Sequence, residues 1–202
     1  MIDIYHFSNP LSTQCLTTEQ CLTSITRDIA QRTHLHFVPI ISTDVITKLE
    51  NHALPFPMTH AVTDTAEILF NVILDFKAAQ LEGNKKARHF LIQLQHELLI
   101  NQQTYTLTLI ENILDKVGIN RSDFFDNRAN KEVISAIIKD QKFAQKIMYK
   151  QSATLAMTFS KDTETQVLTD FSVNDLVLAF APHLTPTVDT DSLRHHLKSY
   201  AY

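Results

Sequence analysis

Glycine is scarce in this sequence of 202 residues, which contains only Gly83 and Gly118. A phosphate-binding loop of the Walker or Rossmann type needs several closely spaced glycines, because its backbone must approach the phosphates. The sequence therefore excludes both kinds of nucleotide-binding loop.

Cysteine is scarce as well, and the sequence has no long apolar run and no excess of basic charge. Two cysteines, Cys15 and Cys21, are too few for a disulfide framework. The sequence has no signal-peptide pattern and no run near the roughly 20 apolar residues of a membrane span, so we expect a cytoplasmic location and no membrane partner. The net charge of −4 and the pI near 6.2 predict no nucleic-acid partner.

The first 60 residues indicate a strand, a helix and a second strand. Residues 2–7 alternate between apolar and polar side chains, as a half-buried strand does, and residues 13–32 carry apolar side chains at helical spacing. The run "LHFVPII" at 35–41 predicts a second strand, parallel to the first. A polar, proline-containing loop is expected over 42–60.

A long helical region follows, and then the period changes to two. The predicted helices cover 63–81, 85–100, 105–117 and 131–149, and Gly83 and Gly118 are placed as left-handed helix C-caps. The segments "SATLAMTF" and "QVLTDF", joined by the polar turn "SKDTET", indicate a β-hairpin. A helix over 173–180 and a tail with a weakly amphipathic stretch at 193–200 end the chain.

This order resembles the DsbA-like family of the thioredoxin superfamily. The most similar segments are "LIENILDKVGINRSDFFD" at 109–126 and "SATLAMTF" at 152–159. The resemblance implies an α/β thioredoxin-like fold with an inserted helical domain. The halves of the thioredoxin-like domain would cover 1–60 and 151–202, the second with the C-terminal tail, and the helical insertion would cover 61–150.

Within that family, "IYHFSNPLSTQC" at 4–15 is most similar to the cytosolic bacterial branch of SpxH-type adaptors. Proteins of that branch deliver a transcription factor to the ClpXP protease. The resemblance implies a protein partner, such as a client of a protease adaptor.

The family's dithiol site is altered in this sequence. In active members the first cysteine of a C-x-x-C motif lies at a helix N-terminus, where the helix dipole lowers its pKa. By resemblance that position is Ser12, and Cys15 matches the second, resolving cysteine. A helix dipole does not ionise a serine, and no neighbouring residue supplies a base. We expect Ser12 to be an N-cap whose hydroxyl accepts a hydrogen bond from a first-turn N–H.

The second landmark of the family is a cis-proline that faces the cysteines. By resemblance that position is Ala153, so the partner groove would consist of Pro10, Ser152, Ala153 and Thr154. A cis bond before alanine costs about 2.5–4 kcal/mol, so we expect a trans bond and a reshaped groove.

Three functions remain open. The first is a protein-binding adaptor that lacks dithiol–disulfide turnover. The second is a thiol–disulfide oxidoreductase or dithiol–disulfide isomerase. The third follows from a further resemblance, to kappa-class glutathione transferases, which use a serine at the position of Ser12 to orient glutathione. No cofactor is expected unless glutathione or another small thiol binds at Ser12.

The sequence contains ten histidines, which are candidate metal ligands. His34 and His36 would share one strand face, and His89 and His96 one helix face, while His195 and His196 are adjacent. None has the H-E-x-x-H or cysteine-paired spacing of a specific metal motif. No metal is therefore expected.

Overall fold

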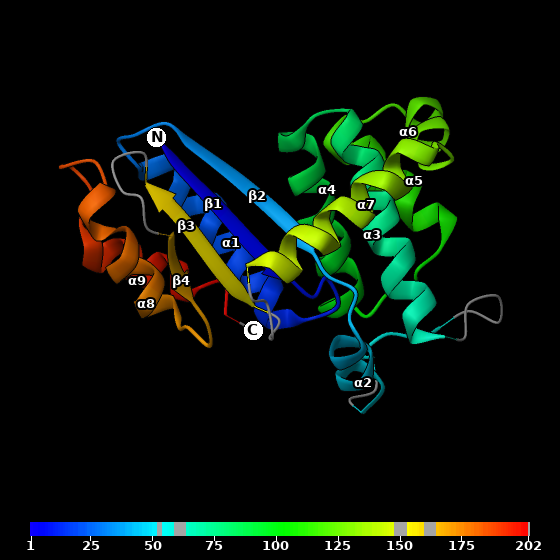
Figure 1. Cartoon of the computed structure of the whole chain (residues 1–202), viewed down its shortest axis with the longest axis horizontal. Helices are drawn as coiled ribbons and strands as arrows, with labels where there is room; N and C mark the ends of the chain where they lie inside the picture. The colour runs from blue at the N-terminus through cyan, green and yellow to red at the C-terminus, as the bar shows by residue number, and fades with distance from the viewer. Residues whose placement is uncertain (52–53, 59–63, 148–152, 160–164, 202) are drawn as a thin grey trace.

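The computed structural model describes residues 1–51, 54–58, 64–147, 153–159 and 165–201. A sheet with helices on both faces lies beside a larger group of helices (Figure 1). Its elements are, in chain order, β1 (Ile2–Ser8), α1 (Thr13–Asp28), β2 (Thr33–Pro39), α2 (Thr43–Asn51), α3 (Thr65–Leu81), α4 (Asn84–Leu99), α5 (Leu107–Val117), α6 (Arg121–Arg128), α7 (Lys131–Lys146), β3 (Thr154–Phe159), β4 (Thr165–Leu168), α8 (Val173–Phe180), the 3₁₀ helix η1 (Ala181–His183) and α9 (Thr190–Lys198).

The sheet has the strand order β2-β1-β3-β4. Strand β1 pairs in parallel with β2 and antiparallel with β3, and β4 pairs antiparallel with β3 at the edge. The predicted parallel unit and the predicted hairpin are both confirmed. The expected turn of that hairpin lies mostly outside the described residues.

The alternation along β1 separates its two faces. Ile2 and Ile4 point into the main core, where they meet apolar residues of α1 such as Leu16 and Leu22. On the opposite face Phe7 joins a smaller apolar cluster with Ala144 of α7. Helix α7 therefore covers one end of the sheet face that α1 leaves free.

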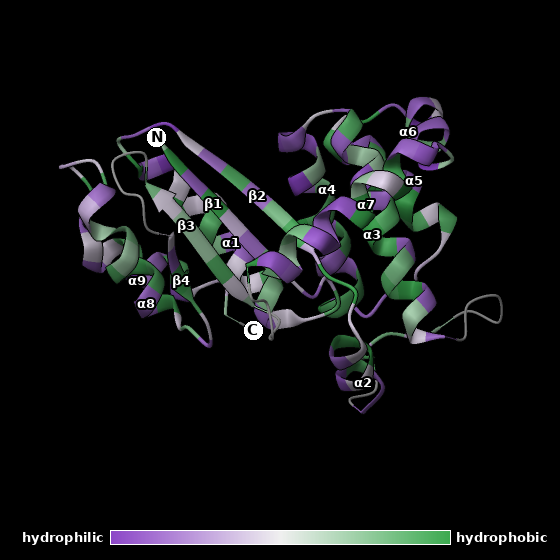
Figure 2. Ribbon diagram, in the orientation of Figure 1, coloured by the Kyte–Doolittle hydropathy of each residue, from purple (hydrophilic) through white to green (hydrophobic). Residues whose placement is uncertain are grey.

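The predicted helical region contains α3 to α7. Helix α3 is buried along most of its length and packs against α4, α6 and α7, whereas α6 is largely hydrophilic (Figure 2). Gly118 ends α5 in the left-handed conformation, at φ 71°, as predicted. Gly83 does not act as predicted, because Glu82 is the C-cap of α3 and Gly83, at φ 117°, is the N-cap of α4.

Two helices contradict the sequence-based expectations. Helix α2 lies inside the segment predicted as a loop, where the Ser42 hydroxyl accepts from the Val45 N–H at 3.2 Å and Val45 and Leu49 bury one face. Helix α6 was not predicted, and Asn120 caps it by accepting from the Asp123 N–H. Both helices are short and bury few apolar side chains, so the apolar periodicity of their sequences is weak.

Some element boundaries also differ from the predictions. Helix α1 ends at Asp28 rather than at residue 32, and β2 lies two residues earlier than predicted. The amphipathic stretch of the tail is the helix α9, which buries Leu193 and Leu197. No helix in the described part of the chain is long and apolar enough to cross a membrane.

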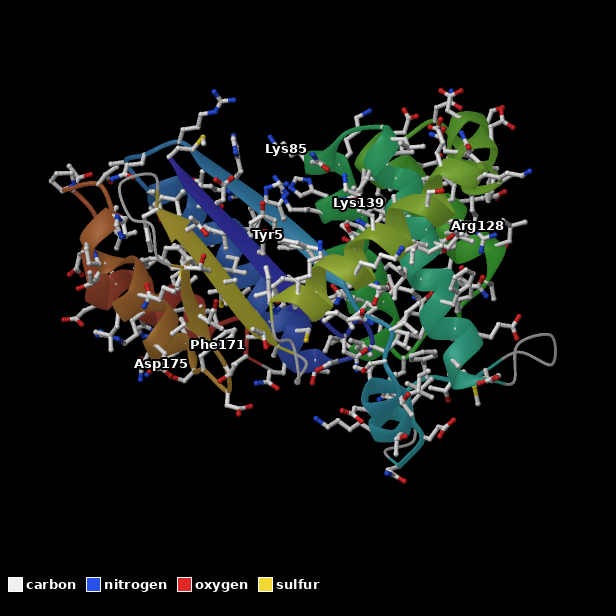
Figure 3. The ribbon with its side chains drawn as sticks, in the orientation of Figure 1. Tyr5, Lys85, Arg128, Lys139, Phe171 and Asp175 are labelled. Carbon is white, nitrogen blue, oxygen red and sulfur yellow. The ribbon has the colours of Figure 1, made fainter. Side chains whose placement is uncertain are left out.

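A charged group links α3 to the segment before α5 and to α6. The Asp75 carboxylate, 1% exposed, accepts from the Tyr105 hydroxyl and from Arg128 Nε, each at 2.5 Å. Arg128 also donates to the Asn71 side chain at 3.0 Å. Arg128 lies in the helical group, far along the chain from Asp75 (Figure 3). A buried carboxylate requires such partners, because an unpaired charge in the interior is costly.

We expect Arg128→Gln to lower the free energy of unfolding by about 1–3 kcal/mol, because it leaves the buried Asp75 carboxylate without its charge partner. The matched control is Arg121→Gln, since Arg121 is exposed and pairs with Asp115 on the surface. Urea denaturation of both variants measures the difference. Equal midpoints for the two variants would refute the structural role of the Asp75 network.

Candidate active site

The candidate site forms where β1 ends and α1 begins. The Asn9 side chain accepts from the Leu11 N–H at 3.0 Å, and the Asn9 carbonyl accepts from the Ser12 N–H at 3.1 Å. These bonds close a tight turn over Pro10, which is buried. The turn delivers Ser12 to the N-cap position of α1, as predicted, with extended backbone angles.

The predicted capping bond of Ser12 is absent from the described part of the chain. The Ser12 hydroxyl instead lies close enough to the Cys15 thiol to lower the pKa of that thiol. The side chain therefore faces the sulfur one helical turn ahead rather than the first-turn N–H groups. The expectation that Ser12 is a side-chain cap is wrong, although its position at the helix start is right.

Cys15 is fully enclosed, with 1% of its surface exposed. Burial first, and then the negative charge of Glu19, raise the pKa of the thiol to about 12. Hydrogen bonds from the Asn9 N–H, at 3.3 Å, and from Ser12 and the Ala153 N–H act in the opposite direction. Because desolvation outweighs these donors, the sulfur is a neutral thiol at neutral pH.

Ala153 lies close to Cys15, where its backbone N–H lowers the pKa of the thiol. Its N–H also donates to the Phe7 carbonyl at 3.1 Å, and its φ is +67°. Proline has a φ near −65°, so the backbone here differs from that of a proline at this position. Thr154 follows as the first residue of β3 and is buried. Ser152 lies outside the described residues, so the trans bond between Ser152 and Ala153 stays a prediction.

A buried His–Glu pair lies beneath the cysteine and was missed from the sequence. Glu19 follows Cys15 by one helical turn, and Glu19 Oε1 is 3.5 Å from His6 Nδ1, with both side chains fully buried. The ring nitrogens of His6 and the carboxylate oxygens of Glu19 have no hydrogen-bond partner among the described residues. A glutamate on the apolar face of the predicted helix, and a histidine at an inward position of the predicted strand, were the available signals.

The second cysteine lies away from this site. Cys21 is buried, its thiol points to the Leu197 carbonyl of α9 at 3.7 Å, and burial raises its pKa to about 12. Both cysteines are free thiols. The six-residue separation along one helix keeps Cys15 and Cys21 apart, so α1 contains no dithiol pair.

A cavity of about 280 Å³ opens next to the first turns of α1. Thr13, Gln14 and Thr17 line one side, and Phe171 and Leu176 line the other. Phe171 lies just before α8 (Figure 3). The site therefore combines an uncharged serine, a buried thiol and an adjacent cavity with polar and apolar walls. Nucleophilic attack by sulfur needs a thiolate, which a buried thiol with a pKa of about 12 does not supply at neutral pH.

Known proteins with similar sequences include an adaptor. The ClpXP adapter protein SpxH of Staphylococcus aureus (strain MRSA252) is 23% identical over 167 residues, which are 83% of this chain and 58% of that protein. The chain thus matches less than two thirds of the length of its curated relatives.

Solved structures with the same fold include disulfide reductases. The cytosolic disulfide reductase DsbM of Pseudomonas aeruginosa has a TM-score of 0.59 at 12% identity, over 98% of this chain and 97% of that chain. Its structure with GSH has a TM-score of 0.57, also at 12% identity, over 98% of both chains. At this identity the likeness shows the shared fold.

A family-wide sequence pattern, described as thioredoxin, matches residues 5–177, which include the sheet, α1 and the helical region. The strand order, the position of Ser12 and Cys15 at the start of α1, and the helices between β2 and β3 agree with that match. The chain belongs to the thioredoxin family, and its fold, with helices between β2 and β3, is similar to that of DsbA-like structures.

Proposed function

We propose that this chain is a cytosolic protein-binding adaptor without dithiol–disulfide turnover. The observation that carries the proposal is that neither Ser12 nor Cys15, at the start of α1, provides an exposed thiolate. Ser12 occupies the place of the attacking thiol, and Cys15 is 1% exposed with a pKa of about 12. Disulfide exchange begins with attack by a thiolate, and neither side chain supplies one.

The surface of α7 supports a binding role. Ile138, half exposed, and Phe143 lie in a groove of about 390 Å³ together with Lys139, Lys142 and Lys146. Lys139 lies on α7 between the sheet and the outer helices (Figure 3). An apolar floor with three flanking cations suits an acidic amphipathic segment of a client protein.

The class of partner is inferred from the curated relatives. SpxH is described as a ClpXP adapter, so we propose that this chain delivers clients to a ClpXP-type protease. One fold hosts many functions, so we propose that this thioredoxin-like surface binds a protein without covalent chemistry. The groove on α7 would hold the client, and Ser12 would take no part.

A second candidate function is binding of a small thiol such as glutathione. It is favoured by the Ser12 hydroxyl, which is directed to a sulfur rather than used as a cap, and by the cavity next to α1. The sulfur of a bound thiol would then take the place of the Cys15 sulfur as the partner of the Ser12 hydroxyl.

Calorimetric titration with reduced glutathione separates the two functions. The adaptor proposal predicts no saturable heat for the wild-type protein or for Ser12→Ala. Saturable binding by wild-type protein that Ser12→Ala weakens by about tenfold or more would instead establish the thiol-binding function, since one lost hydrogen bond to a charged group costs about 1.5–3 kcal/mol.

Native wild-type protein should react negligibly with a thiol reagent at about pH 8. A pKa raised to about 12 leaves roughly 10⁻⁴ of the Cys15 thiol ionised, and both cysteines are buried. Ser12→Cys should add one fast-reacting thiol and measurable insulin reduction, because the new sulfur lies at the N-terminus of α1. Ser12→Ala is the control. Insulin reduction by wild-type protein above background would contradict the proposal.

Some proteins should accumulate in cells that lack this chain. The purified chain should accelerate the degradation of those proteins by ClpXP. Ile138→Glu should slow this by about tenfold or more, because a charge in the groove removes an apolar anchor. Leu178→Glu is the matched control, since Leu178 is exposed on α8, away from α7. The degradation rate is read with and without each variant.

Two outcomes of that experiment contradict the adaptor function. The first is equal degradation with and without wild-type chain. The second is loss of stimulation in Ser12→Ala, which would assign the serine a direct role.

A further inference from the structure

The free part of the outer sheet face carries a group of side chains that the candidate active site does not use. Asp3 of β1 is the register partner of His34 of β2, and His36 follows two residues later on the same face. Each of the three side chains is between 30% and 40% exposed. The group lies beyond the end of the sheet that α7 covers.

The ligand atoms of this group converge. Asp3 Oδ1 is 3.0 Å from His34 Nδ1 and 4.0 Å from His36 Nε2, and all three ligand atoms lie within 4.8 Å of one another. Ligand atoms about 2.0–2.2 Å from one Zn²⁺ in a tetrahedral site lie roughly 3.3–3.5 Å apart. Small side-chain rotations therefore bring the three atoms to bonding distance.

The surroundings hold the rings in place. The His36 ring stacks on Tyr5 at 4.6 Å between centroids, and Tyr5 packs edge-on against Phe143 of α7 at 5.1 Å. Figure 3 shows Tyr5 on the sheet. Because the three ligands lie on two paired strands, their backbone positions are fixed before any ion binds.

We propose that Asp3, His34 and His36 form a binding site for a divalent late transition-metal ion, with Zn²⁺ as the reference case. Two imidazoles and one carboxylate are a common three-ligand set for such ions. The remaining coordination positions face solvent and would hold water or a side chain of a bound protein. The site spans β1 and β2, so an ion there would link the two strands.

Two nearby charges act on this site in opposite directions. Arg88 and Asp140 both act on His36, the first repelling and the second attracting positive charge. Arg88 donates to the Leu35 carbonyl at 3.1 Å, so its guanidinium is engaged by the backbone. The site is independent of the proposed adaptor function, since it shares no residue with the start of α1 or the groove on α7.

Isothermal titration with Zn²⁺ tests the site in the whole 202-residue chain. Wild-type protein should bind one equivalent. His36→Gln and Asp3→Asn should each weaken binding by about tenfold or more, because loss of even an outer-shell partner costs about 10–100-fold. His195→Gln is the control, since His195 and His196 are neighbouring histidines of α9 that could bind zinc adventitiously.

Two further readouts accompany the titration. Zn²⁺ should raise the melting temperature of the wild-type protein and of His195→Gln but not of His36→Gln, because an ion bound only by the folded state stabilises it. His36 is half exposed, so this variant should fold, and circular dichroism checks that it does. The proposal is overturned if wild-type protein binds no zinc, if His36→Gln binds it as tightly, or if His195→Gln loses the binding.

Discussion

Strand β1 is the element on which the rest of the structure depends. It is hydrogen-bonded on both sides, to β2 in parallel and to β3 in the antiparallel direction, and its side chains alternate between two different surroundings. One face meets α1 in the core, and the other meets α7 or solvent. Its last residues lead into the Asn9 turn that places Ser12 and Cys15. A shift of one residue in register would exchange the two faces and displace the site.

The region under the start of α1 contains polar groups that a core of this size rarely leaves unpaired. Glu19 and His6 are fully buried, 3.5 Å apart, and make no hydrogen bond among the described residues. Burying such groups without hydrogen bonds costs stability, so the pair is better understood through its effect on the thiol. Burial is the main cause of the raised pKa of Cys15, and the negative charge of Glu19 raises that pKa further.

The two proposals use different faces and different physical interactions of one scaffold. The α7 groove offers apolar area and lysines to a client protein, whereas the Asp3–His34–His36 group offers ligand atoms to an ion. Tyr5 and Phe143 lie between them, because Tyr5 stacks on His36 and Phe143 lines the groove. A protein side chain that completes an ion's coordination would therefore approach from the side of α7.

The sequence by itself determined the features that are local in the chain. Apolar periodicity predicted β1, α1, the parallel β2 and the late hairpin, and Gly118 marked the end of α5, because each signal lies within one element. The resemblance placed Ser12 and Cys15 at the start of α1 for the same reason. The sequence did not reveal α2 or α6. These two short helices are held by a few buried side chains and by caps from Ser42 and Asn120.

Only the tertiary structure decided the properties that depend on contacts between distant segments. The pKa of Cys15 depends on its burial and on contacts with Glu19 and Ala153. The Asp75 network joins Asp75 to residues 30 and 53 positions away along the chain. The sequence showed His34 and His36 on one face but not that Asp3 lies opposite His34, because strand register is fixed by long-range pairing. Periodicity specifies which face of an element a residue occupies, while packing specifies what that face meets.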